Sequence, residues 1–264
     1  MNEDRLVIGE NLFGVFDGAA SLSGPPAASR QGVPDKPPGR TGGSMAASIA
    51  GKTFAANHFP LTDLGRTANT AILNQMKESG VNTSAIEEVW STSAAVVRIK
   101  GNDLEWFQTG DSHILVIYED GSHSIPAQRD DHDFETLTMM KAEEDNTLAN
   151  PVLKRQVLKV RAGMNKKYGV LNGDPAAMAF ASGGTLSLDR VEAVLLFTDG
   201  LNLPAPVPEK KKCFTPLALS FRELGLKGLH RKIRVLEEGD PDRRAFPRFK
   251  RHDDIAAIAL HLKP

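Results

Sequence analysis

Short runs of apolar residues recur along most of the chain, several of them followed directly by glycine or aspartate, and they predict β-strands. Many are separated by only a few turn residues, which predicts antiparallel hairpins. The expected strands are Arg5–Ile8, Leu12–Phe16, Ser91–Ile99, Leu104–Thr109, His113–Tyr118, Ser122–Ile125, Gly184–Leu188, Glu192–Phe197 and Ile255–Leu262.

Other segments repeat their apolar residues every three or four positions, a spacing that predicts amphipathic helices. The clearest case places Leu64, Ala68 and Ile72 on one face. The expected helices are Ser44–Asn57, Thr62–Ser79, Asp133–Glu144, Val152–Arg161 and Leu217–Leu236. Strand hairpins mixed with helix pairs predict the α+β class, with helices covering sheets.

One segment fits neither pattern. Ala19–Gly43 is rich in glycine, proline, serine and alanine and has almost no large apolar residues, so we expect a long mobile loop there. The chain has 264 residues, enough for one sizeable core, and no repeat or shift in composition marks a boundary. We therefore expect a single domain over residues 1–264, with the loop at 19–43 as an insertion.

Composition and charge narrow the function mainly by exclusion. Hydrophobic residues make up 41% and charged residues 25%, as in ordinary globular proteins. The net charge of −1 argues against nucleic acid or an acidic membrane as a partner. No apolar run approaches the roughly 20 residues of a membrane span, and the single cysteine cannot form an internal disulfide. We expect a cytoplasmic protein, and the sequence leaves its oligomeric state open.

Candidate chemistry gathers at the ends of three predicted strands. Val194–Gly200 and Leu12–Gly18 are both apolar runs that end in Asp-Gly, and Asp253 and Asp254 lead directly into the last strand. We expect Gly200 to permit a sharp turn, because a residue without Cβ tolerates positive φ. Carboxylates at one end of three strands predict a cluster of oxygen ligands suited to Mg²⁺ or Mn²⁺.

Six motifs, in this order along the chain, resemble the metal-dependent protein phosphatases, the PPM or type 2C serine/threonine phosphatase family, in a divergent bacterial form. They are Asn2-Glu3-Asp4, GVFDG at Gly14–Gly18, STSAAVV at Ser91–Val97, GDS at Gly110–Ser112, LLFTDG at Leu195–Gly200 and HDDIAAIAL at His252–Leu260. The resemblance spans essentially the whole chain. It implies a four-layer α/β/β/α sandwich of two antiparallel sheets flanked by helices, with two metal ions at one end.

The resemblance also implies a set of metal ligands. Asp17 would bridge two Mn²⁺ or Mg²⁺ ions, Glu3 would act on the second ion through water, and Asp111 would help to hold a third. Two such ions roughly 3.5–4 Å apart can activate a water for hydrolysis. The resemblance implies that the substrate is a phosphoserine or phosphothreonine ester on a phosphorylated protein. The implied ligands are Glu3, Asp17, the carbonyl of Gly18, Asp111, Asp199 and Asp253.

The sequence departs from the family pattern in three places. The family has His-Gly-Gly after the first Asp-Gly, with the histidine assigned as a proton donor, whereas Ala19-Ala20-Ser21 stand here. The family also has a phosphate-binding arginine shortly before the Glu-Asp pair, and the sequence begins too late to include it. A carboxylate usually lies four residues after the aspartate of the TDG motif, and this chain has Leu203 there.

Other residues are candidates for the missing roles. His252 adjoins Asp253 and is a candidate general acid. Arg248 and Arg251 belong to a basic segment next to the same aspartate and are candidates for binding the substrate phosphate. Lys210–Lys212, by contrast, is interpreted as an exposed, solvated loop.

Two alternatives stay open beside the phosphoprotein phosphatase. The first is a pseudophosphatase that binds a phosphorylated partner without turnover, which the missing histidine and arginine favour. The second is a phosphatase that acts on a small phosphorylated metabolite.

Overall fold

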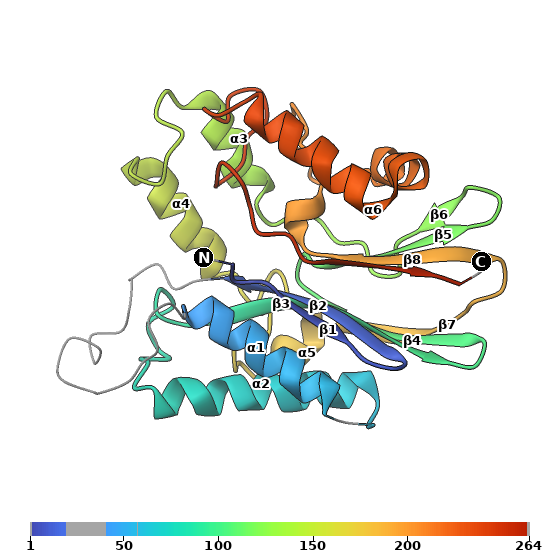
Figure 1. Cartoon of the computed structure of the whole chain (residues 1–264). Helices are drawn as coiled ribbons and strands as arrows, with labels where there is room; N and C mark the ends of the chain where they lie inside the picture. The colour runs from blue at the N-terminus through green and yellow to red at the C-terminus, as the bar shows by residue number, and fades with distance from the viewer. Residues whose placement is uncertain (1, 20–40, 57, 263–264) are drawn as a thin grey trace.

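Two antiparallel sheets pack face to face, and helices cover the outer side of each (Figure 1). The computed structural model describes residues 2–19, 41–56 and 58–262. The first sheet has the order β1-β2-β3-β4-β7 and the second the order β6-β5-β8-β9. The strands are β1 Arg5–Ile8, β2 Leu12–Ala19, β3 Ser91–Lys100, β4 Asp103–Thr109, β5 His113–Tyr118, β6 His123–Ser124, β7 Ser182–Ser187, β8 Val191–Phe197 and β9 Ala257–His261.

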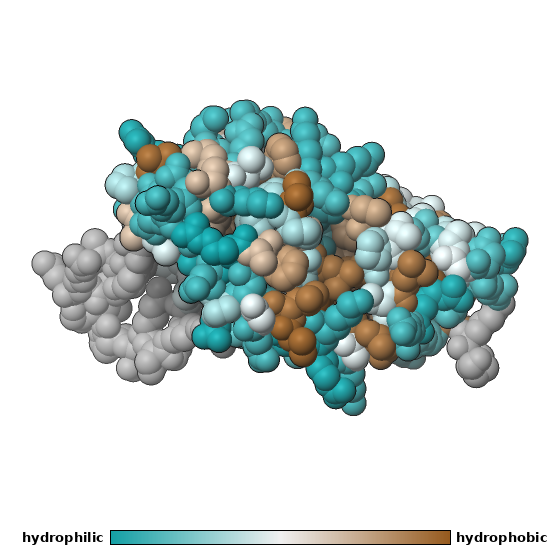
Figure 2. Space-filling view, turned by 90° about the horizontal axis from the view of Figure 1, so that it is seen from above, coloured by the Kyte–Doolittle hydropathy of each residue, from teal (hydrophilic) through white to brown (hydrophobic). Residues whose placement is uncertain are grey.

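Helices α1 and α2 lie on the first sheet, and α6 lies on the second (Figure 1). Seen from the α6 side, the surface is mostly hydrophilic, with apolar residues gathered near its middle (Figure 2). No helix among the described residues is long and apolar enough to cross a membrane. The helices are α1 Gly42–Ala55, α2 Leu61–Glu78, α3 Phe134–Ala142, α4 Pro151–Arg161, α5 Ala177–Phe180 and α6 Thr215–Glu238.

The central strands β3, β5 and β8 are buried on both faces, which explains why they read as nearly continuous apolar runs. Successive side chains of a strand point to opposite faces. On β2, Val15 packs between the two sheets while Phe16 packs under α1. On β8, Val194 faces the first sheet while Leu195 packs against α6. These apolar layers hold the strand ends in fixed positions relative to one another.

The α+β class and the two-sheet sandwich are confirmed, and the differences lie at element boundaries. β2 continues through Ala19 and α1 begins at Gly42, so the predicted loop is too long at both ends; residues 20–40 lie outside the described part of the chain. α1 begins early because Thr41 caps it, its hydroxyl accepting a hydrogen bond from the Ser44 amide at 3.1 Å. α6 is broken at Gly225, where φ is 65°.

A buried ion pair between Asp240 and Arg248 organises the segment between α6 and β9. The Asp240 carboxylate accepts hydrogen bonds from the amides of residues 244, 245 and 246, and it lies 2.8 Å from the Arg248 guanidinium. Burial raises the pKa of Asp240, but these donors outweigh it and hold the pKa below its ordinary value. The network orders the backbone that leads to Asp253.

We expect Arg248→Ala to lower the free energy of unfolding by roughly 2–3 kcal/mol, because it removes charge-assisted hydrogen bonds from a buried carboxylate. A double-mutant cycle with Asp240→Asn, measured by urea denaturation, should give strong coupling between the two sites. Arg251→Ala is the control, since this side chain is exposed. Equal losses from Arg248→Ala and Arg251→Ala would contradict the structural role of Arg248.

Candidate metal centre

Carboxylates from both sheets interact with one another. The strand ends that carry them lie at the end of the sandwich where the N-terminus lies (Figure 1). Asp17 lies near the C-terminal end of β2, and Asp111 lies in the turn between β4 and β5. Asp199 follows β8, and Asp253 precedes β9. The fifth member, Asp4, stands just before β1. Antiparallel hairpins bring these positions together because strands that enter and leave the same end of a sheet place their termini side by side.

The electrostatics of this cluster are dominated by burial and mutual repulsion. Burial raises the pKa of Asp17 well above its ordinary value, and the carboxylates of Asp199, Asp4, Asp111 and Asp253 raise it further. Burial likewise raises the pKa of Asp199, with Asp253 and Asp111 adding to the effect. The acids of this cluster repel one another, and carboxylate oxygens are the ligands that Mg²⁺ and Mn²⁺ prefer. The residues present therefore fit a divalent cation.

The glycine of each Asp-Gly pair is required by close packing. A Cβ on Gly18 would collide with the backbone of Gly43 in the first turn of α1, and a Cβ on Gly200 would collide with the carbonyl of Asp254. Neither glycine has a positive φ, so the sequence-based explanation of Gly200 by turn geometry was wrong. The close approach locks each aspartate against a second segment of the chain.

The N-terminal residues are joined to the cluster by hydrogen bonds. The Thr198 hydroxyl donates to the Asp4 carboxylate at 2.7 Å, and burial raises the pKa of Asp4 to about 6. The Glu3 amide donates to Asp254 at 2.8 Å, while the Glu3 carboxylate accepts a hydrogen bond from the Thr41 hydroxyl. Asp4, which the sequence analysis left without a role, is thus one of the acids that act on Asp17, whereas Glu3 is not.

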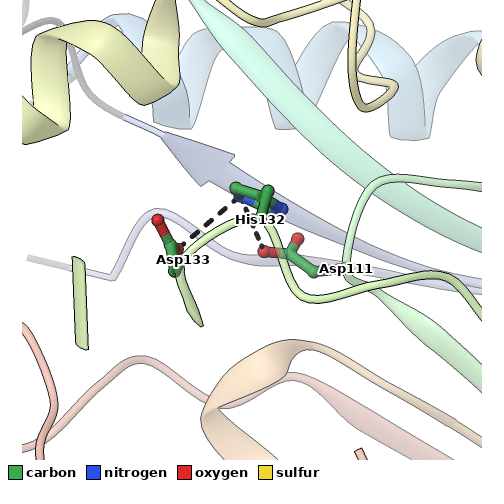
Figure 3. Close-up of side chains that lie close together, drawn as sticks. All are labelled: Asp111, His132 and Asp133. Carbon is green, nitrogen blue, oxygen red and sulfur yellow. Dashed lines mark ion pairs between the residues drawn. The ribbon is translucent and has the colours of Figure 1, made fainter. Parts of the chain in front are cut away.

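A second group extends the cluster away from Asp17. Figure 3 shows the imidazole of His132 between the carboxylates of Asp111 and Asp133, with its Nε2 at 3.7 Å and 3.6 Å from their nearest oxygens. One ligand atom from each of the three lies within 4.8 Å of the others, an arrangement that could hold a metal ion. The ring of His132 is stacked on Tyr168, with centroids 3.9 Å apart, which fixes its orientation.

The charges of this second group are partly balanced. Burial raises the pKa of Asp111, but His132 and Lys212 outweigh it and hold the pKa below its ordinary value. Burial raises the pKa of Asp133 to about 6. The sequence analysis assigned Asp111 but missed His132 and Asp133. The run of acids on either side of His132 was the available signal, and it was passed over because no second histidine accompanies it at ligand spacing.

Two lysines lie beside the carboxylates. The Lys212 ammonium is 3.4 Å from Asp131; its burial lowers the pKa, but Asp131, Asp199 and Asp111 outweigh this and raise it. The Lys250 ammonium is 2.7 Å from Asp253, and this carboxylate raises the lysine pKa in spite of burial. Both lysines line a cavity with Asp199. The interpretation of Lys212 as part of a solvated loop was wrong.

The other predicted residues are engaged in different contacts. All five N–H donors of Arg248 are used, by the carbonyls of residues 237, 240, 246 and 251 and by the Asp240 carboxylate. Arg251 is exposed. The Nδ1 of His252 lies 3.1 Å from the Glu237 carboxylate. The roles predicted for these three residues in phosphate binding and proton donation stay predictions, and the contacts of Arg248 favour a structural role.

Comparisons with known proteins agree with this architecture. Residues 4–235 match the family described as protein phosphatase 2C. No curated protein sequence matches the chain. A crystal structure of the serine/threonine phosphatase PstP/Ppp of Mycobacterium tuberculosis covers 100% of this chain and is itself covered to 93%, with 17% identity and a TM-score of 0.56.

Two further structures show the same fold. The catalytic domain of PstP in complex with two manganese ions covers 98% of this chain and is covered to 90%, with 16% identity and a TM-score of 0.54. PppA, a regulatory component of the type VI secretion system in Pseudomonas aeruginosa, gives the same coverage and TM-score with 19% identity. Because the family match extends over most of its length, the chain belongs to the protein phosphatase 2C family of metal-dependent serine/threonine protein phosphatases.

Proposed function

We propose that the carboxylate cluster is the active site, and that it hydrolyses phosphoserine and phosphothreonine esters on a phosphorylated protein. The convergence of Asp4, Asp17, Asp111, Asp199 and Asp253 carries the proposal, because such repulsion at one place is useful when a cation is bound there. The proposal includes a single domain over residues 1–264. A cytoplasmic setting is supported by the single cysteine, Cys213.

The proposed ligands divide into two groups. Asp17 interacts electrostatically with acids of both sheets, and it would bridge two ions, with Asp199, Asp253 and the carbonyl of Gly18 as further ligands. Glu3 would act through water, and Asp4, which accepts a hydrogen bond from the Thr198 hydroxyl, would support Asp17 from its side of the cluster. The group of Asp111, His132 and Asp133 would hold a third ion.

The donor set and the manganese in the similar PstP structure support Mn²⁺ or Mg²⁺ as the cofactor. Two such ions, when bound, supply a water of lowered pKa and neutralise the charge of the phosphoryl group. The chain's own contribution is positioning and positive charge. Lys212 and Lys250 line the cavity beside the acids, where their ammonium groups would attract the phosphate dianion.

We expect Asp17→Asn to lower Mn²⁺-dependent hydrolysis of p-nitrophenyl phosphate by at least about 100-fold, because it removes the proposed bridging ligand. Calorimetric titration should show weaker Mn²⁺ binding. In EDTA the melting temperature should stay the same or rise, since the raised pKa of Asp17 means that its ionised form opposes folding at neutral pH.

Asp242→Asn is the matched control, because this aspartate is exposed. Near-wild-type turnover by Asp17→Asn would show that the ligand assignment is wrong. Mn²⁺ binding by the wild-type chain without turnover of any phosphoester would instead indicate the pseudophosphatase. Turnover of small phosphoesters but not of phosphopeptides would indicate the metabolite phosphatase.

We expect Lys212→Met to raise the KM for a phosphopeptide about three- to tenfold, with a smaller change in kcat, because it removes a cation that faces the phosphate. Lys210→Met is the control: it lies in the same loop, but its ammonium pairs with the exposed Asp130. Steady-state kinetics at a saturating Mn²⁺ concentration will distinguish the two. Equal KM values for both variants would contradict the role of Lys212.

A further inference from the structure

The cavity that holds the carboxylates has a second, apolar part. Its volume is about 420 Å³, within the roughly 300–1,000 Å³ range of ligand sites. Asp111, Asp199 and Asp253 line one part of it. The name apolar cleft is used here for the apolar lining of this cavity, which consists of Leu137, Leu203, Phe214, Leu217, Phe246 and Phe249, together with several prolines; Glu209, Lys232, Glu237 and Arg248 line the same cavity.

The walls of the apolar cleft are held in place before anything binds. Phe214 and Leu217 belong to the apolar cluster under α6, and Leu203 packs against the same cluster. The segment that carries Phe246 and Phe249 is fixed by the five hydrogen bonds of Arg248. A preformed site loses little conformational entropy on binding, so the cleft is suited to recognition.

Several of these side chains keep apolar area available to a ligand. Phe246, Phe249, Leu203 and Leu137 are each half-buried. An apolar group placed between them would remove this area and its own from water, which is favourable in proportion to the area covered. Leu203 stands at a position where the family usually has a carboxylate, so the cleft is more apolar than the family pattern implies.

We propose that the apolar cleft receives a leucine- to phenylalanine-sized side chain of the phosphoprotein substrate, close in sequence to the phosphorylated residue. The inference rests on the proposed function, because it places the phosphate at the carboxylate end of the same cavity. One residue of extended chain spans about 3.3 Å, so a side chain one to three residues from the phosphoserine can reach the cleft. Lys212 and Lys250 line the same cavity, and their positive charges complement the phosphate.

The first test compares phosphoserine peptides of an alanine and glycine background. Each carries a single leucine, phenylalanine, lysine or aspartate at one of the three positions on either side of the phosphoserine. At one position we expect leucine or phenylalanine to raise kcat/KM at least about tenfold over alanine. Equal values for all peptides, or a preference for lysine or aspartate alone, would overturn the inference.

The second test asks whether the preference comes from the cleft. Phe249→Ser and Leu203→Ser should each remove most of the preference for the apolar peptide while leaving turnover of p-nitrophenyl phosphate within about twofold. Val207→Ser is the matched control, because Val207 is in the same loop as Leu203 and is 61% exposed, and it does not line the cavity. Melting temperatures will show whether either variant is unfolded. If one is, the result for the folded variant tests the inference. A preference that survives in both folded variants would contradict the inference.

The third test does not depend on catalysis. Cys213, the single cysteine of the chain, is exposed and lines the cavity, so its alkylation by iodoacetamide reports occupancy of the cleft. The unphosphorylated leucine peptide should slow this reaction, and the alanine peptide should not. If it slows alkylation while no phosphopeptide is hydrolysed, the proposed function fails and the docking inference stands. If every phosphopeptide is hydrolysed alike and alkylation is unchanged, the inference fails and the proposed function stands.

Discussion

Repulsion between neighbouring carboxylates is the force that the rest of the structure has to overcome. Two unit charges 4 Å apart still repel by about 4 kcal/mol in the effective dielectric near a protein surface, and Asp17 has four acidic neighbours. Hydrophobic burial elsewhere must hold these groups together against that force. The three apolar layers of the sandwich provide it, because they fix β2 and β8 from both faces.

Close packing at the glycines then fixes the positions of the neighbouring carboxylates. Gly18 and Gly200 admit a second backbone segment at distances that any side chain would prevent. Lys212 and Lys250 balance part of the negative charge from outside the sheets. Three features therefore build the site. Apolar strands hold the carboxylates together against their repulsion, glycines allow a second backbone segment to pack closely, and lysines balance part of the negative charge. The loss of any one would leave the carboxylates either dispersed or unpaired.

Much of this could be predicted from the sequence, because strand ends and glycines are local signals. Asp17 and Asp199 stand after apolar runs, and a sandwich follows from hairpins mixed with helix pairs. Other features depend on residues distant in the chain. Lys212 seemed solvated because its neighbours in sequence are lysines, whereas its partners are Asp111, Asp131 and Asp199. His132 has no second histidine at ligand spacing in the sequence, and its partner Asp111 comes from the connection between β4 and β5, which joins the two sheets. Tertiary contacts of this kind leave no periodic trace in a sequence.

The hydrogen bonds of Thr198 have a consequence for how the protein is made. Its hydroxyl donates to Asp4 and accepts from the amide of Ala256, so residues from the two extremes of the described chain meet at one oxygen atom. A chain emerging from the ribosome cannot complete this junction until β9 has been synthesised. The first sheet can collapse earlier, since β1 to β4 are close in sequence. Cation binding is therefore expected to be a late event in biosynthesis, after the scaffold has formed.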